Sequence, residues 1–178
     1  MTGGRREFLK AAGCFGCAGA LGGCALFESG LRYRSGGELH RDFHASFLDG
    51  YDYVRENYGD DAIREVMGSF ARETYRSMHE KLKAGDGSEL VEWWRYYQDR
   101  EGGASAVSES ADGATLEVRD CPARAHLKMR GIGGGERLCA ATRLFNEELT
   151  RGTPFAIEMT SCGVCGCRQR LVRKGAAS

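Results

Sequence analysis

The chemistry that this chain could perform is concentrated in its cysteines. Three of the eight, Cys162, Cys165 and Cys167, fall between two segments that alternate like strands. Thiolates at this spacing on a tight turn can hold a Zn²⁺ ion at about 2.3 Å, with Cys121 or Cys139 as the fourth ligand. The second Cys-x-x-Cys pair of a standard zinc site is missing. Disulfides and functional thiols therefore remain open alternatives to a metal site.

Cys121 is the best candidate for a nucleophile. Together with Pro122 it opens a predicted short helix, and the dipole and free N–H groups of a helix N-terminus favour a thiolate. His126 lies five residues further on, off the same helical face, so we expect no direct Cys–His pair within this helix.

Glu158 is a second catalytic candidate, in the strand that precedes the cysteine turn. If helices cover both faces of the sheet, this carboxylate is a buried general base close to the thiols. If one face is open to water, as in many antiparallel sheets, it is a solvated residue. The pattern of the strand does not decide between these alternatives.

Composition limits the class of protein. The chain has 178 residues, of which 42% are apolar and 10% aromatic, which is typical of one folded domain with a core. The formal net charge is zero. Nothing in this balance argues for a nucleic-acid partner or an acidic membrane surface, and we expect no nucleic-acid partner.

Residues 1–27 have the pattern of a twin-arginine export signal. Arg5 and Arg6 are followed by Phe, Leu and Lys, and then by an uncharged run rich in glycine and alanine. The predicted partner is the twin-arginine translocase, and the predicted location is periplasmic or otherwise extracytoplasmic. Two processing routes stay open: cleavage after the small residues 18–20, or lipidation of Cys24, which would anchor the protein to a membrane.

The rest of the chain predicts one α+β domain over residues 39–174, after a polar linker over residues 28–38. Apolar residues at helical spacing predict helices, and alternating residues between glycine-rich turns predict strands. The N-terminal helices should pack on a roughly four-stranded antiparallel sheet, with two further helices between its hairpins. The predicted helices cover residues 39–58, 61–83, 89–99, 122–129 and 136–150, and the predicted strands cover 105–110, 114–119, 155–160 and 167–173.

The helix over residues 89–99 carries the aromatic stretch Trp93-Trp94-Arg95-Tyr96-Tyr97. Aromatic clusters are most common in protein cores, so we expect this stretch to pack in the core rather than to form a lid above a pocket. Trp93 is our candidate for an aromatic contact with a substrate.

The C-terminal half resembles a known family. Cys121-Pro122 opens a short helix, Leu138-Cys139 lies early in the next, and a cysteine-bearing turn leads into the last strand. These features are similar to those of the L-2-amino-thiazoline-4-carboxylic acid hydrolase family and, more distantly, of vinyl-4-reductase-like small-molecule-binding domains. The resemblance implies functional positions at Cys121, Cys139 and Cys167. The export signal, the additional Cys162 and Cys165, and a more basic last strand depart from the pattern.

These features are consistent with two alternative functions. The first is an exported hydrolase that opens a small sulfur–nitrogen heterocycle or an amidine-like C–N bond. In this interpretation Cys121 or water attacks, Glu158 or a histidine moves the proton, and Arg168 or Arg170 pairs with the substrate carboxylate. The alternative is a non-catalytic module in which thiols or a zinc ion shape a pocket for a small molecule.

Overall fold

The computed structural model describes residues 36–110, 112–161 and 166–175. These residues all belong to one compact unit, Ser35–Ser178. The predicted export signal over residues 1–27 and the first part of the predicted linker lie outside the described residues. The end of that linker does not match the prediction, since helix α3, Gly36–Ser69, begins three residues before the predicted start at Leu39. The described helices include none that is long and apolar enough to cross a membrane.

Helix α3 is bent at Gly59, where the backbone has a φ of 87°. This left-handed conformation is accessible to glycine at little cost, which explains why the predicted helix boundary becomes a kink. A π-helical turn, η1 at Phe70–Thr74, then separates α3 from α4 at Arg76–Lys83. The predicted helix over residues 61–83 is therefore interrupted in the middle, close to the cavity described below.

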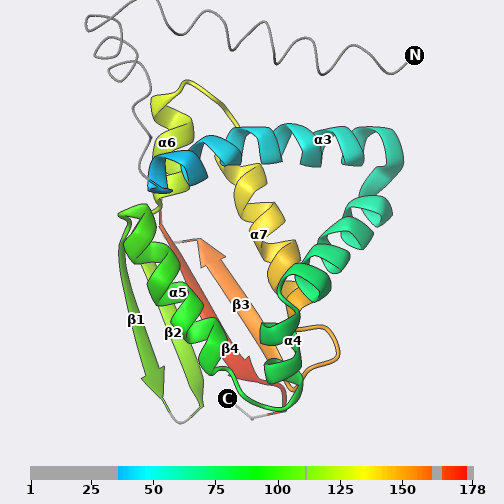
Figure 1. Ribbon diagram of the computed structural model, residues 1–178, viewed down its shortest axis with the longest axis vertical. Helices are drawn as coiled ribbons and strands as arrows, with labels where there is room; N and C mark the ends of the chain where they lie inside the picture. Colours follow the sequence, from blue (N-terminus) through cyan, green and yellow to red (C-terminus); the bar gives the residue numbers. More distant parts are fainter. Residues whose placement is uncertain (1–35, 111, 162–165, 176–178) are drawn as a thin grey trace, which may run out of the picture. The chain divides into compact units, whose positions relative to one another are not determined.

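The remaining elements follow the predicted order. They are helix α5 (Ser88–Glu101), strands β1 (Ala104–Ser110) and β2 (Gly113–Asp120), helices α6 (Pro122–Met129) and α7 (Gly135–Leu149), and strands β3 (Phe155–Ser161) and β4 (Cys167–Arg173). The strands form one antiparallel sheet in the order β1-β2-β4-β3 (Figure 1). The predicted α+β fold is thus confirmed.

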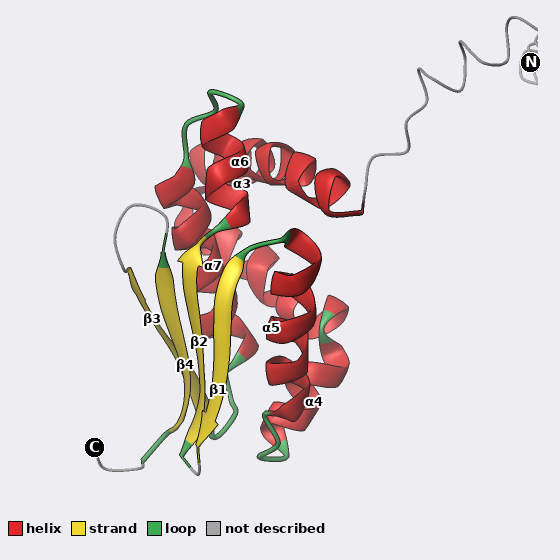
Figure 2. Ribbon diagram, turned by 90° about the vertical axis from the view of Figure 1, so that its left-hand side faces the viewer, coloured by secondary structure: helices red, strands yellow, loops and turns green. Residues whose placement is uncertain are grey.

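Helices α4, α5 and α7 lie on one side of the sheet, and α6 with the first part of α3 lies beyond the ends of the strands (Figure 2). Successive strand residues point to opposite faces, so only every second residue can reach the helical layer. On β4, Gln169 and Leu171 are buried while Arg168 and Arg170 are exposed. The sheet therefore has one inner face, which packs on helices, and one outer face, which is open to water.

The core fills the space between the inner face and the helices. Some apolar residues that recur at helical spacing in α3 are nevertheless exposed: Phe43 is 61% exposed and Tyr58 66%. Both lie in the part of α3 before the kink at Gly59. This part covers less of the core than a helix with a continuous buried apolar face would cover. Residues with 4% exposure or less that form the centre of the core are Ile63, Met67, Ala71, Met78, Leu82, Leu90, Val91, Trp94, Leu116, Val118, Ala141, Leu149, Phe155 and Leu171.

A buried carboxylate holds α7 against the second arm of α3. Glu148 is 2% exposed, and its side chain accepts hydrogen bonds from Arg64 at 3.1 Å, Arg72 at 3.4 Å and Arg151 at 2.8 Å. Burial alone would raise the pKa of Glu148, but the hydrogen bonds from Arg151 and Arg64 outweigh it and hold the pKa below its ordinary value. This interaction therefore needs an ionised carboxylate.

Replacing Glu148 should test this contribution. We expect Glu148→Gln to lower the free energy of unfolding by about 1–3 kcal/mol, because three arginines lose a shared charged acceptor. Since the folded pKa lies below the unfolded one, the contribution is complete above the unfolded value of about 4.3 and is lost as the pH falls through the folded value. Urea unfolding at several pH values measures both effects. Glu147→Gln, an exposed neighbour, should change stability by less than about 0.5 kcal/mol, and equal losses for the two variants would contradict the expectation.

Candidate functional site

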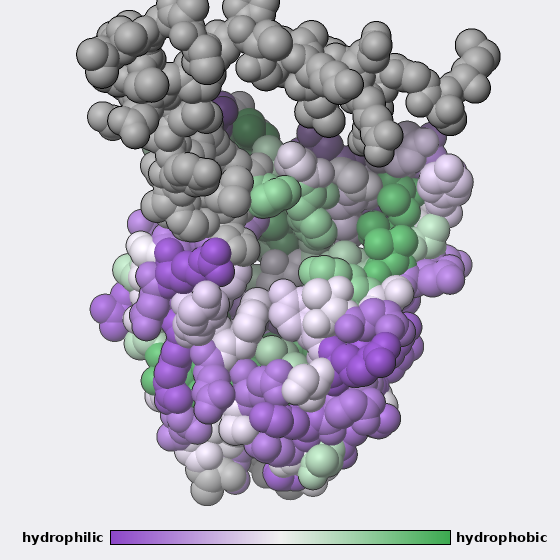
Figure 3. Space-filling model, in the orientation of Figure 1, coloured by the Kyte–Doolittle hydropathy of each residue, from purple (hydrophilic) through white to green (hydrophobic). Residues whose placement is uncertain are grey.

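A cavity of about 370 Å³ lies between the inner face of the sheet and helices α3, α5 and α7. Its volume is at the lower end of the range of about 300–1,000 Å³ that is usual for small-molecule sites. On the face shown in Figure 3, hydrophobic side chains gather towards α3, whereas the opposite end is mostly hydrophilic. The lining includes Phe47, Phe70, Tyr75, Trp93, Trp94, Tyr97, Leu116, Val118, Leu138, Phe145 and Met159.

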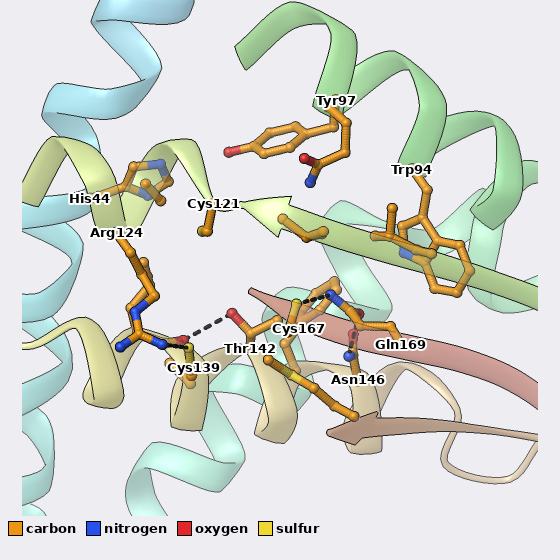
Figure 4. A pocket seen from close by; sticks show the side chains of 18 of the residues that line it. His44, Trp94, Tyr97, Cys121, Arg124, Cys139, Thr142, Asn146, Cys167 and Gln169 are labelled. Carbon is orange, nitrogen blue, oxygen red and sulfur yellow. Dashed lines mark hydrogen bonds between the residues drawn. The ribbon is translucent and has the colours of Figure 1, made fainter. Parts of the chain in front are cut away.

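Three cysteines that are distant in sequence line this cavity (Figure 4). Cys121 is the residue before α6, Cys139 lies in α7, and Cys167 is the first residue of β4. Each is partly buried, and the thiols of Cys121 and Cys139 are free. The structure thus brings together the three positions that the family resemblance implies.

The predicted zinc site depends on residues that the structure leaves out. Cys162 and Cys165 lie outside the described residues, so their relation to Cys167 stays a prediction. Among residues 36–110, 112–161 and 166–175, no three His, Cys, Asp or Glu side chains lie close enough together to hold a metal ion.

Cys121 is not the thiolate that its helix position suggests. Burial raises the pKa of the Cys121 thiol, and this effect outweighs the backbone N–H groups of Arg124 and Ala123, which lower it. Cys139 raises the pKa of Cys121 further, while the charge of Arg124 lowers it. The prediction from the sequence considered the helix N-terminus, which lowers the pKa of the thiol. It did not consider burial of the sulfur, which raises that pKa. Cys121 is therefore a neutral thiol at neutral pH.

Glu158, Arg168 and Arg170 do not face the cavity. Their side chains are exposed on the outer face of the sheet, where Arg170 pairs with Glu158 at 3.6 Å and Arg168 pairs with Glu117 at 3.3 Å. The predicted general base and the predicted carboxylate-binding arginines are thus separated from the three thiols by the sheet itself. The physical reason is that helices cover only one face of the sheet. Glu158 lies on the other face and is therefore a solvated residue, not a buried general base.

Arg124 is the cation that the sequence analysis missed. It is the only arginine or lysine among the described residues that line the cavity, and its Nη1 lies 3.8 Å from the Cys139 sulfur. One signal was available: Arg124 follows Cys121 by three residues, a spacing that places two side chains on the same side of a helix. In Figure 4 the guanidinium marks one end of the cavity.

A buried amide pair also lines the cavity, apart from Arg124 (Figure 4). Asn146, 4% exposed, donates a hydrogen bond of 2.8 Å from Nδ2 to Oε1 of Gln169, which is 8% exposed. The Gln169 Nε2 lies 4.0 Å from the Cys167 sulfur. Gln169 follows Cys167 by two positions on β4 and therefore shares its face, a signal that sequence alone could have provided. The partnership with Asn146 depends on tertiary packing and could not be foreseen.

Aromatic side chains form one wall of the cavity. Trp93, the predicted substrate contact, lies in the lining, stacks on Tyr97 with ring centroids 5.1 Å apart, and meets Tyr75 edge-on at 5.7 Å. Its neighbour Trp94 is 2% exposed and belongs to the core. Burial raises the pKa of Tyr97 to about 12, with a smaller contribution from Glu101. The phenol therefore stays protonated and neutral at physiological pH.

Comparison of the chain with protein-family models, with curated proteins and with solved structures gives no match. The chemistry of the cavity must therefore be derived from its own residues. Those residues combine a mainly apolar wall, one guanidinium, a buried amide pair and the sulfur atoms of three cysteines. Such a site can enclose a small organic molecule and orient it by an anionic group.

The protonation of Cys121 can be tested by alkylation. We expect the rate of iodoacetamide labelling at Cys121, followed by peptide mass spectrometry, to reach half its maximum at a pH above the ordinary thiol value of about 8.5, because burial disfavours the thiolate. Arg124→Gln should move that midpoint to still higher pH, since it removes a nearby positive charge. A midpoint near or below pH 7 in the native protein would show that Cys121 is an activated thiolate.

Proposed function

We propose that the protein binds a small, largely apolar organic acid in the thiol-lined cavity. One observation carries the proposal: a mainly aromatic and aliphatic lining contains a single arginine or lysine among its described residues, Arg124. An anionic group that enters this lining meets a cation in surroundings of low polarity, where charge-assisted hydrogen bonds are strong. The apolar wall would bind the rest of the molecule through the hydrophobic effect.

The two tryptophans of the chain provide a built-in reporter, because both line the cavity. We expect the dye 8-anilinonaphthalene-1-sulfonate, which is apolar and anionic, to bind and to emit when tryptophan is excited. Arg124→Gln should weaken binding tenfold or more, in keeping with the loss of about 1.5–3 kcal/mol from a hydrogen bond to a charged group.

Arg168→Gln is the matched control, because it removes the same charge from the outer face of the sheet. It should leave dye binding unchanged. Equal weakening by both variants would mean that the dye responds to the overall charge of the protein, and it would contradict a role for the cavity.

We propose as a second candidate that the bound molecule is hydrolysed, as the resemblance to the thiazoline hydrolase family implies. The convergence of Cys121, Cys139 and Cys167 on one cavity supports it. Water or the Cys121 sulfur would attack the amidine-like carbon, and His44, which also lines the cavity, would accept the proton. The ring C–N or C–S bond would then break, and the proton would pass to the leaving nitrogen or sulfur. Attack by sulfur would need a second step, in which water releases the product from Cys121.

Turnover of L-2-amino-thiazoline-4-carboxylate tests this second candidate. Cys121→Ala should lower the rate more than about 100-fold if the thiol attacks, because no other group would replace it. Because Glu158 and Arg170 lie on the outer face, Glu158→Gln and Arg170→Gln should retain the native rate. Full turnover in folded Cys121→Ala and Cys139→Ser variants would remove the thiol mechanism.

We also propose that the chain is exported by the twin-arginine translocase, on the basis of Arg5 and Arg6. Replacing both arginines with lysine should leave the protein in the cytoplasm, as measured by cell fractionation and immunoblotting. Unchanged export of the doubly substituted chain would contradict this route.

A further inference from the structure

The buried amide of Gln169 has donor capacity that the described residues do not use. A glutamine side chain has two N–H donors. Within the described parts of the chain the Nε2 of Gln169 has one partner, the Cys167 sulfur at 4.0 Å, which is at the far limit for such a contact. The Oε1 of Gln169 is occupied by Asn146 at 2.8 Å, which fixes the orientation of the amide. At least one N–H of a side chain that is 8% exposed therefore remains available in the lining.

Buried donors in proteins are nearly always satisfied, because a buried N–H without an acceptor has lost its hydrogen bond to water and gained none in return. An available donor in the wall of a cavity thus points to an acceptor that the cavity receives. The amide is held in place by its bond to Asn146 on α7, so the donor does not need to be ordered when a ligand arrives. The Gln169 amide is therefore preorganised to bind an acceptor on a ligand.

Two polar groups of the lining come from different elements, the Arg124 guanidinium from α6 and the Gln169 amide from β4. In Figure 4 the Arg124 guanidinium and the Gln169 amide are well separated, with Cys121, Cys139 and Cys167 between them. Most of the remaining lining is aromatic, aliphatic or sulfur-bearing. A ligand that contacts both Arg124 and Gln169 therefore carries a polar group at each contact and an apolar framework between them.

The size of the cavity sets a lower limit on such a ligand. A single thiazoline ring with its carboxylate would leave much of the 370 Å³ unfilled, so the cavity favours a larger molecule. The stacked Trp93 and Tyr97 rings on one side favour a flat molecule, because aromatic faces pack best on other planar groups.

We propose that the cavity selects flat bicyclic carboxylates that carry a hydrogen-bond acceptor, a ring nitrogen or a carbonyl, at the end remote from the carboxylate. The carboxylate pairs with Arg124, and the remote acceptor receives the hydrogen bond from Gln169 Nε2. This assignment rests on the proposed binding function and adds the class of ligand.

Two isosteric probes isolate the acceptor. Quinoline-6-carboxylate has a ring nitrogen on the ring remote from its carboxylate, and 2-naphthoate has a C–H at the same place. Isothermal titration calorimetry on the full chain should give about 3- to 10-fold tighter binding for quinoline-6-carboxylate, which corresponds to one net hydrogen bond. Quinoline-6-carboxamide, which lacks the charge, should bind at least tenfold more weakly than the carboxylate.

Two variants should separate the contributions. Gln169→Leu should abolish the preference for quinoline over naphthalene and keep the preference for carboxylate over carboxamide. Arg124→Gln should do the reverse. Arg168→Gln, on the outer face of the same strand, should change neither preference. The comparison of probes on the native protein decides the matter even if a variant does not fold.

Equal affinities of quinoline-6-carboxylate and 2-naphthoate for the native protein would overturn the role of Gln169 while leaving the binding function intact. The same conclusion would follow if Gln169→Leu folds and retains the preference for the ring nitrogen. If the native protein binds neither these probes nor the anionic dye, both the ligand class and the binding function are overturned.

Discussion

The site depends on a single geometrical constraint: a four-stranded sheet with helices on one face only. In a strand, neighbouring residues point to opposite faces, so β4 sends Cys167 and Gln169 towards the cavity and Arg168 and Arg170 towards water. A slip of one residue in the pairing of β4 would exchange the two sets. The register with β2 and β3 on either side fixes this choice, because β4 is an inner strand of the sheet.

The other wall of the cavity is held by charges at the edges of the helical layer. Glu148 on α7 accepts hydrogen bonds from Arg64 and Arg72, and Arg137 at the start of α7 pairs with Asp52 of α3. These ion pairs lie near the two ends of α7, and the residues between them can therefore line an apolar space. The same lack of water keeps Cys121 protonated, which favours binding of a ligand over spontaneous reactivity of the thiol.

Much of the fold could be predicted because it is governed by local periodicity. The alternation over residues 155–160 and 167–173 predicted the two strands, and the boundary between the first two predicted helices falls at the kink at Gly59. The face of the last strand was not predicted correctly, because Arg168 and Arg170 were assigned to the substrate site together with Cys167. The site was less predictable, because it depends on which sheet face the helices cover. The sequence allowed Glu158 to be either buried or solvated. The position of the helices on one face of the sheet shows that it is solvated.

The missed residues share a physical reason. Arg124 lies on a short helix, where an arginine is most often solvated. Its spacing from Cys121 is a local signal, but its contact with Cys139 depends on how α6 packs on α7. The Asn146–Gln169 pair joins elements that are far apart in the sequence, so its existence depends on tertiary packing. By contrast, Cys121, Cys139 and Cys167 were identified from the family resemblance, and the cavity brings them together.

The decisive measurement is a crystal structure of the protein derivatised with methylmercury, which labels thiols and gives a strong anomalous signal. Mercury atoms on Cys121, Cys139 and Cys167 should surround a single cavity between α7 and the inner face of the sheet. Mercury on any of these three at the outer face, or the sulfur of Cys121 separated from that of Cys167 by the sheet, would contradict the proposed site.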